Sequence, residues 1–517
     1  MAKKETQFME TRRLEGQRCE CSAEISLPDY NTDVRKILYF SATPHHISSF
    51  ASADALECSG EVVFDVIYLD FEGAVSSASF SGDYNFKVKC DTENYKDSLV
   101  ETSLDNVSLR LMSPRKIAAK ATLDSDVMIL SEKSFICEGD ALDEARAPQL
   151  ERTFAMARRT SITKPKEREY ADSLCRFDGK TVDDVQLLHI HSSPKIERVS
   201  MEGENCEIGG YIYVEALIKT DDCPICKFEK KLELSEQIPL ENVSEGAELY
   251  PYVKVVSEAA SIRGDESGVE LVLNIISESQ VVSEENQRLE LLTDNYLTTC
   301  DCENVYSEAS FDEYLGRVVA EEEINEKIPF ESLGVGKLRD VVFTTAKARI
   351  KSRDIDGDKM KIEGEILVSS IANEINNEED VEIIPLKFSH EFTKNVNLNC
   401  QITPNIEIFT DIDLQDVSVN IDTDAVFLHG KMHISCTMAE RRKIAALKSS
   451  NVVPDSDFTT NPARIEVYYP TAGESLYSIA KSHHTTLEKI AEDNPDVAEV
   501  FGAVDEKSAK IKRLIIT

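Results

Sequence analysis

The chain of 517 residues contains no tryptophan, and nowhere in it do eighteen uncharged apolar residues stand together. A helix needs about 20 predominantly apolar residues to cross a bilayer, so the sequence predicts no membrane span. The N-terminal decapeptide MAKKETQFME has two lysines but no apolar run behind them, which argues against a secretory signal peptide. The missing tryptophan is a small argument against a sugar-cleaving cleft, although tyrosine can replace it as a stacking platform.

Basic side chains are scarce as well. The chain has 57 Lys and Arg against 95 Asp and Glu, a formal net charge of -38. Such a surface repels nucleic acid and anionic lipid at long range, so nucleic acid is not an expected partner. Two interpretations of the acidity stay open: it keeps the protein soluble, or it forms a surface for a basic partner.

The thirteen cysteines are an odd number scattered over a long chain, which favours reduced thiols in a cytosol over a disulfide framework. Cys223 and Cys226 have the spacing of a zinc knuckle or a redox pair. No second CxxC exists, although Cys19 with Cys21, or Cys300 with Cys302, could complete a four-sulfur site. The simpler interpretation is a turn with buried thiols.

Other candidates for chemistry are weak. His189 and His191 share one face of an expected strand, with no carboxylate or thiol nearby at a ligand-like spacing. Asp354, Asp356 and Asp358 are similar to a calcium loop, yet no Glu stands at its twelfth position. Neither a phosphate-binding glycine loop nor a nucleophile elbow occurs. We therefore expect no enzymatic activity, no metal and no cofactor.

One sequence segment recurs with a period near 150 residues. Gly60 opens GEVVFDVIY, Gly210 opens GYIYVEALI and Gly364 opens GEILVSSIA, at separations of 150 and 154 residues. Segments 202–210 and 356–364 align residue for residue, and both indicate a hairpin turn followed by a strand. These copies indicate three related units.

The alignment extends downstream, where Phe80, Leu234 and Phe388 recur at intervals of 154 residues. Each copy then ends in strands with apolar residues at every second position, as in VELVLNII from Val269. This alternation is typical of antiparallel sheets with one buried face. The sequence therefore predicts a mainly β protein with three tandem antiparallel β-sandwich-like repeats.

The expected organisation has six segments. They are a disordered N-terminus (1–18), three repeats (19–140, 160–290 and 300–440), a linker (441–463) and a C-terminal domain (464–517). Residues 311–326 follow helix spacing through Tyr314, Leu315, Val318 and Val319, so we expect a helix there. The linker loses sheet alternation and gathers Ser, Asp, Pro and Thr, so we expect the last domain to be tethered.

The C-terminal segment has two short helical patterns behind a strand. Leu476, Ile479 and Ala480 share one helix face, and Leu487, Ile490 and Ala491 repeat that spacing. Thr485 with Glu488 has the form of a capping box. Residues 510–517, KIKRLIIT, supply a closing strand.

This segment resembles a LysM module, a small βααβ domain, through the Tyr469 strand, the turn at 473–476, Thr485 to Leu487 and Asn494-Pro495. The resemblance implies a shallow groove that binds N-acetylglucosamine polymers, such as peptidoglycan, or a protein. By position, the groove residues are Gly473, Glu474, Ser475 and Leu476 on one side and Asn494, Pro495 and Asp496 on the other. The usual Gly-Asp-Thr-Leu is Gly-Glu-Ser-Leu here, and the Pro-Gly-Gln before the last strand is missing.

The three repeats, LPDYNTDVRKIL from Leu27 to Leu38 and the C-terminal module together resemble the SPOCS family, also known as domain of unknown function 3794. This resemblance implies a non-catalytic scaffold of spore coat and cortex assembly. The implied partner is the spore morphogenetic ATPase, or another coat or envelope protein, with the LysM module as the tether. The implied location is the mother-cell cytoplasm, at the surface of the developing spore.

Overall fold

The computed structural model describes residues 2–91, 93–375, 381–458, 465–471, 474–495 and 513–517. The predicted mainly β fold is confirmed: long antiparallel strands fill most of the described chain. Its α-helices within these ranges are short, namely α1 (Phe330–Leu333), α2 (Leu476–Ser482) and α3 (Leu487–Asp493).

Three units of one topology follow each other along the chain. Unit 1 contains β1 (Ala2–Ser26), β2 (Val34–Ser52), β3 (Ala55–Asp70), β4 (Val75–Lys89), β5 (Tyr95–Ser113) and β6 (Lys116–Gly139). Unit 2 contains β7 (Gln149–Ile162), β8 (Lys166–Asp178), β9 (Val185–Glu202), β10 (Asn205–Thr220), β11 (Cys223–Pro239), β12 (Glu248–Asp265) and β13 (Gly268–Tyr296). Unit 3 contains β14 (Cys300–Pro329), β15 (Lys337–Asp356), β16 (Lys359–Ile375), β17 (Val381–Asn397), β18 (Ile406–Ile421) and β19 (Ala425–Asp457).

Each unit packs two antiparallel sheets. One sheet is a three-stranded meander, β2-β3-β4, β9-β10-β11 or β15-β16-β17. The other joins the first, last and penultimate strands of the unit, as in β1-β6-β5 and β14-β19-β18. In unit 2 the first strand is split into β7 and β8 around Pro165, which has no N–H to donate to a sheet.

The recurring glycines have a packing reason. Gly60, Gly210 and Gly364 occupy the same place in the central strand of each meander. A Cβ atom there would lie 2.3, 2.0 and 2.4 Å from the carbonyl oxygen of the residue fifteen positions earlier on the neighbouring strand. Only glycine permits so close an approach of two backbones.

The strand register corrects the predicted downstream alignment. The residues that oppose the three glycines are Tyr84, Leu234 and Phe392. Phe80 and Phe388 lie elsewhere in the ladder, opposite Phe64 and Val368. The loops between the strands differ in length, so a constant interval of 154 residues does not join equivalent positions.

The three units close into a ring, the head of the molecule. Unit 1 contacts unit 2 through β4 and β9, unit 2 contacts unit 3 through β11 and β15, and unit 3 contacts unit 1 through β17 and β2. Each contact joins the last strand of one meander to the first strand of the next, a head-to-tail arrangement that closes after three steps.

Equivalent residues meet at the centre of the ring. Tyr39, His189 and Phe343 are separated by 150 and 154 residues in the sequence. Their ring centroids form a triangle with sides of 5.5, 5.3 and 5.6 Å. Ile67, Leu217 and Ile371, also at equivalent positions, pack in the same buried cluster. The head therefore has a pseudo-threefold axis through an aromatic core.

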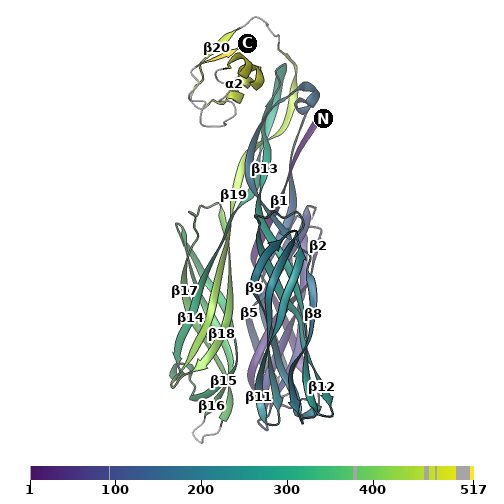
Figure 1. Ribbon diagram of the computed structural model, residues 1–517, viewed down its shortest axis with the longest axis vertical. Coiled ribbons are helices and arrows are strands. Elements are labelled where there is room, and N and C mark those ends of the chain that lie inside the picture. Colours follow the sequence, from purple (N-terminus) through teal and green to yellow (C-terminus); the bar gives the residue numbers. More distant parts are fainter. Residues whose placement is uncertain (1, 92, 376–380, 459–464, 472–473, 496–512) are drawn as a thin grey trace.

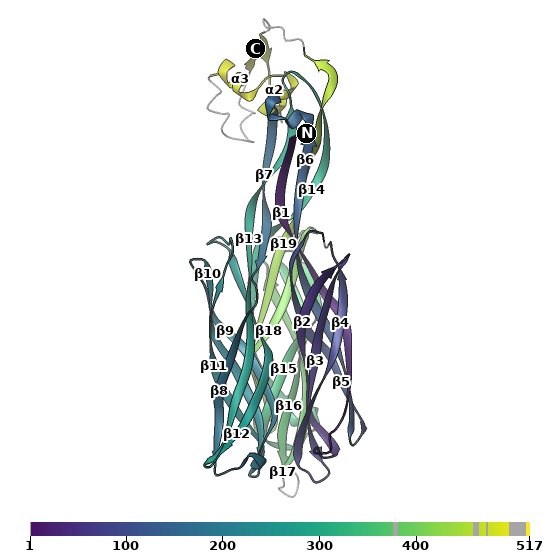
Figure 2. The ribbon, with the colours of Figure 1, turned by 90° about the vertical axis from the view of Figure 1, so that its right-hand side faces the viewer.

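A stalk extends from the head (Figure 1; Figure 2). It consists of the ends of the paired strands β1 and β6, β7 and β13, and β14 and β19, which pack against one another. Phe8, Leu289, Leu291 and Phe311 are among its buried apolar side chains. The N-terminus and the described residues of the C-terminal module, 465–471, 474–495 and 513–517, lie at its tip (Figure 1).

The stalk also buries charge. Arg158 Nε donates to Glu284 Oε2 at 2.7 Å, and both side chains are almost completely buried. Thr160 donates to the same carboxylate oxygen at 2.8 Å, and Thr11 of β1 donates to Thr160. This chain of hydrogen bonds satisfies the buried carboxylate and joins units 1 and 2 within the stalk.

Three segments differ from the prediction. Residues 2–18, expected to be disordered, belong to β1, and 441–457, expected to be a linker, belong to β19. Residues 311–326, expected to be helical, belong to β14. A register shift between Tyr314 and Gly316 interrupts the alternation of β14. Leu315 is the extra residue of this bulge and Val319 is 55% exposed, so the apolar residues at helix spacing do not share one buried face.

Candidate functional site

The C-terminal module has its own small core. β20 (Glu466–Tyr468) pairs antiparallel with β21 (Leu514–Ile516), and α2 and α3 pack beside them. The predicted apolar helix face is observed, since Ile479, Ala480 and Ile490 are buried in this core. The expected capping box at Thr485 is wrong by one residue. Thr486 is the N-cap of α3, because its hydroxyl accepts from Lys489 N, and Thr485 is buried.

The predicted groove begins at the turn before α2, where Gly473 lies outside the described residues. The Glu474 carboxylate accepts hydrogen bonds from Thr471 N at 2.8 Å and from the Tyr468 hydroxyl at 2.8 and 2.9 Å. The Thr471 N–H and the Tyr468 hydroxyl hold the pKa of this carboxyl below its usual value. Ser475 caps α2, since its hydroxyl accepts from Ser478 N at 3.0 Å. Leu476 is partly buried against the module core.

The other side of the predicted groove is formed by the residues after α3. Asn494 is buried, and its amide donates to Ile490 O at 2.8 Å and to Ile515 O at 2.7 Å. Its side-chain oxygen accepts from Ile515 N at 2.7 Å. Pro495 is exposed, and Asp496 lies outside the described residues. Asn494 therefore joins the end of α3 to β21 and has little capacity left for a ligand.

The described groove segments lie beside the paired strands, because Glu474 accepts from Tyr468 of β20 and Asn494 bonds to Ile515 of β21. The module rests on the stalk along α2 and the turn that follows it. The Tyr296 hydroxyl donates to Thr485 O at 2.7 Å, and the Tyr296 and Tyr477 rings pack edge to face at 5.2 Å. Lys481 forms an ion pair with Asp294 at 2.5 Å. The stalk also contacts the first turn of α2 beside the groove residues Ser475 and Leu476, because the Tyr477 hydroxyl donates to Gln149 O at 3.2 Å.

This contact corrects the expectation of a tethered domain. Tyr296, at the end of β13, is part of the module's buried core together with Ile479 and Leu514. Sequence analysis missed this role of Tyr296, because nothing in the local pattern connects it to helices that lie almost 200 residues later. The only available signal was an aromatic residue at the end of a long strand.

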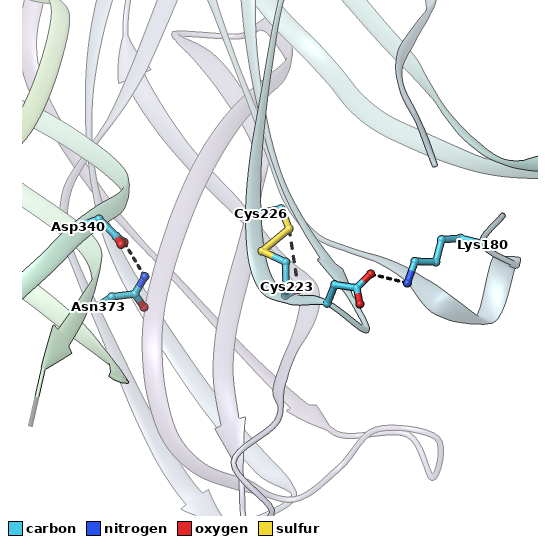
Figure 3. Close-up of a disulfide and its surroundings, with 6 residues drawn as sticks. Lys180, Cys223, Cys226, Asp340 and Asn373 are labelled. Atoms are coloured by element: carbon cyan, nitrogen blue, oxygen red, sulfur yellow. Dashed lines mark hydrogen bonds and ion pairs between the residues drawn. A yellow bond between two sulfur atoms is a disulfide. The ribbon is translucent and has the colours of Figure 1, made fainter. Parts of the chain in front are cut away.

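The CxxC motif lies in the turn from β10 into β11 (Figure 3). Cys223 and Cys226 form a disulfide, so the expectation of reduced thiols fails for this pair. Figure 3 shows it between Lys180, which pairs with Asp222, and the Asp340–Asn373 hydrogen bond of unit 3. Cys19, Cys21, Cys300 and Cys302 are free and lie in other strands. Within the described ranges, no three His, Cys, Asp or Glu side chains are grouped as metal ligands.

Titratable side chains also occur inside the head. A cavity of about 610 Å³ between units 1 and 2 is lined in part by Asp65, His189 and Glu258. Burial lowers the pKa of His189 to about 3, and its Nδ1 atom lies 3.7 Å from Asp65 Oδ2. Burial raises the pKa of Glu258 to about 7. These groups make the head sensitive to pH.

Comparison with known proteins assigns the C-terminal module alone. Residues 471–499 match the LysM domain family. No curated protein matches the chain, and no solved structure matches it. Among the described residues, no helix has the length and apolar character needed to cross a membrane. A LysM domain is a binding module, so the family match points to recognition.

Proposed function

We propose that the chain is a non-catalytic adaptor whose LysM module binds N-acetylglucosamine polymers such as peptidoglycan. The observation that carries this proposal is the position of the module. The module stands at the tip of the stalk, which contacts the α2–α3 turn through Tyr296 and contacts α2 through Tyr477 and Lys481 (Figure 1). A module at the tip of the stalk can meet a large insoluble ligand without interference from the head.

The test is co-sedimentation of the full chain with purified peptidoglycan sacculi and, separately, with chitin. We expect both polymers to retain the chain, and soluble N-acetylglucosamine oligomers to release it. A chain ending at residue 463, shown by circular dichroism to keep its β content, is the matched control and should stay in the supernatant. Equal recovery of both chains in the pellet, or neither, would contradict the proposal.

A second function concerns the head and stalk, and it is favoured by the ring of three related units. We propose that this part is a scaffold of spore coat and cortex assembly, supported by the resemblance of the repeats and the module to the SPOCS family. Under this proposal the protein acts in the mother-cell cytoplasm at the surface of the developing spore. It docks there on the spore morphogenetic ATPase or on another coat or envelope protein.

Multivalency suits this role, because several weak contacts on one rigid chain combine through effective concentration. The test is the localisation of a fluorescently tagged chain in a sporulating cell, with and without residues 464–517. We expect the shortened chain to lose its position at the forespore while it stays folded. Unchanged localisation would refute the role of the LysM module as the tether.

A further inference from the structure

The disulfide of the head spans a β-bulge at the start of β11 (Figure 3). Ile218 pairs with Cys226 and Thr220 pairs with Cys223, so one residue of β10, Lys219, stands opposite two residues of β11. Side chains three residues apart in a regular strand point to opposite faces, and the bulge brings the two cysteines together. The disulfide therefore clamps the bulge.

The residues of this bulge contact both neighbouring units. Ile225, which lies between the two cysteines, is buried in the cluster at the centre of the ring, together with Tyr39 of unit 1 and Phe343 of unit 3. Lys219 Nζ donates to Val75 O of unit 1 at 2.8 Å. The packing of unit 2 in the ring therefore depends on the conformation of the bulge.

Unit 1 makes the same contact without a bulge and without a disulfide. Within the described residues, β3 pairs with β4 without a register shift, and Val75, the equivalent of Ile225, is buried in the same cluster. The Asp70 carboxylate holds this turn, because it accepts from Glu72 N at 2.9 Å and from Ala74 N at 2.8 Å. Unit 2 replaces this hydrogen-bonded clamp with a covalent bond that thiols can break.

Both cysteines of the clamp are partly exposed, so a small thiol can reach them. The thiolate of one thiol molecule attacks one sulfur, breaks the S–S bond and forms a mixed disulfide, while the other cysteine leaves and takes up a proton. A second thiol molecule attacks the mixed disulfide and releases the second cysteine, which is protonated in turn. Two electrons pass to the cysteine pair, and the two thiol molecules become one disulfide. The reverse reaction closes the pair with that disulfide as the oxidant.

We infer that Cys223 and Cys226 form a reversible redox site through which low-molecular-weight thiols and disulfides control the packing of unit 2 in the head. The closed disulfide holds Ile225 in the aromatic core, and reduction frees the bulge and loosens its contacts with units 1 and 3. In a reducing cytosol the pair is open, and it closes on contact with an oxidant. This inference concerns the head and is independent of the ligand of the LysM module.

The first test is a redox titration of the full chain in mixtures of glutathione and its disulfide. After an acid quench, the chain is unfolded and its free thiols are alkylated. Mass spectrometry of the peptide that contains residues 223–226 should show a change from two alkyl groups to none as the mixture becomes more oxidising. Cys175→Ser, which removes a free cysteine of the same unit, should show the same transition. Two alkyl groups in every mixture, or none in every mixture, would overturn the inference.

The second test compares hydrogen exchange of the oxidised and the reduced chain by mass spectrometry. Because the disulfide restricts a short loop, exchange in residues 218–226 should be about tenfold slower when the pair is closed. Reduction should also speed exchange at the start of β4, where Val75 accepts from Lys219, and in β15, which contacts β11. Helix α2, at the tip of the stalk, is the internal control and should not respond (Figure 1).

The Cys223→Ser/Cys226→Ser variant should exchange like the reduced chain in both buffers, with its β content checked by circular dichroism. A response of this variant to reductant would assign the effect to another cysteine and overturn the inference. If the variant does not fold, the two redox states of the unmodified chain still decide. Equal exchange in both states, or a change confined to residues 218–226, would refute control of the packing between units.

Discussion

At the scale of single residues, His189 makes the head sensitive to acid. Its pKa is about 3 in the folded protein against 6.5 without burial, so the unfolded chain binds more protons between these values. The neutral, buried imidazole therefore does not lower the free energy of unfolding above pH 6.5. The free energy of unfolding falls as the pH decreases from 6.5 towards 3. At pH 5 this costs about 2 kcal/mol. His189→Phe, which copies Phe343, should therefore raise the thermal midpoint at pH 5.

At pH 8 the imidazole is neutral in both states, and the two proteins should differ much less. The comparison between the two pH values separates ionisation from packing. Glu258 acts in the opposite direction, because its raised pKa makes folding more favourable on acidification from pH 7. A midpoint that falls equally in both proteins between pH 8 and pH 5 would show that His189 does not carry the effect.

Asn494, expected to line the groove, instead joins the end of α3 to β21. Asn494→Leu would leave Ile490 O and both backbone groups of Ile515 without their partner, and such buried groups cost about 1–3 kcal/mol each. We expect faster hydrogen exchange in α3 and β21, measured by mass spectrometry. Pro495→Ala, at the exposed neighbour, should leave exchange unchanged. Normal protection in Asn494→Leu would contradict the structural role.

At the scale of elements, Tyr296 of the stalk packs into the core of the LysM module. Tyr296→Ala removes a buried ring and should weaken docking by about 3 kcal/mol, a typical cost of a large-to-small change in a core. Tyr296→Phe removes only the hydrogen bond to Thr485 and should cost about 1 kcal/mol. Hydrogen exchange rates in α2 and in the last residues of β13 would show which of the two variants weakens docking more.

The same experiment distinguishes docking from folding. If the module becomes mobile but stays folded in Tyr296→Ala, exchange should rise most where α2 meets the stalk, and the module should still bind its ligand. Uniform loss of protection across α2 and α3 would mean that Tyr296 is part of the module's folding core. Unchanged protection would mean that the Lys481–Asp294 ion pair and the Tyr477–Gln149 hydrogen bond are sufficient to hold the module.

At the scale of the whole molecule, the aromatic triangle couples the three units. Phe343→Ala opens a cavity where Tyr39 and His189 meet it and should cost about 3 kcal/mol or more. Because the triangle belongs to the entire ring, hydrogen exchange should rise in β2 and β9 as well as in β15. Phe392→Ala, inside unit 3, is the control and should raise exchange in that unit alone. A purely local effect of Phe343→Ala would refute the coupling.

The sequence by itself determined the local features of this protein. Alternating apolar residues predict antiparallel strands because side chains of a strand face opposite sides in turn. The recurrence of glycine predicts three units, because each glycine lies against the equivalent backbone carbonyl of the neighbouring strand in its own unit. Two apolar triplets at helix spacing predict the two helices of the LysM module, namely Leu476, Ile479 and Ala480, and Leu487, Ile490 and Ala491. Each of these features depends on residues close together in the chain.

Only the tertiary structure decided how these parts are joined. The ring, the stalk and the contact of Tyr296 with the LysM module depend on contacts between residues far apart in the sequence, which no local pattern encodes. The helix predicted over 311–326 was wrong for a related reason, because the long-range pairing with β19 holds this segment as a strand whatever its local spacing. The role of Asn494 was likewise decided by β21, because its side chain bonds to a strand twenty-one residues away.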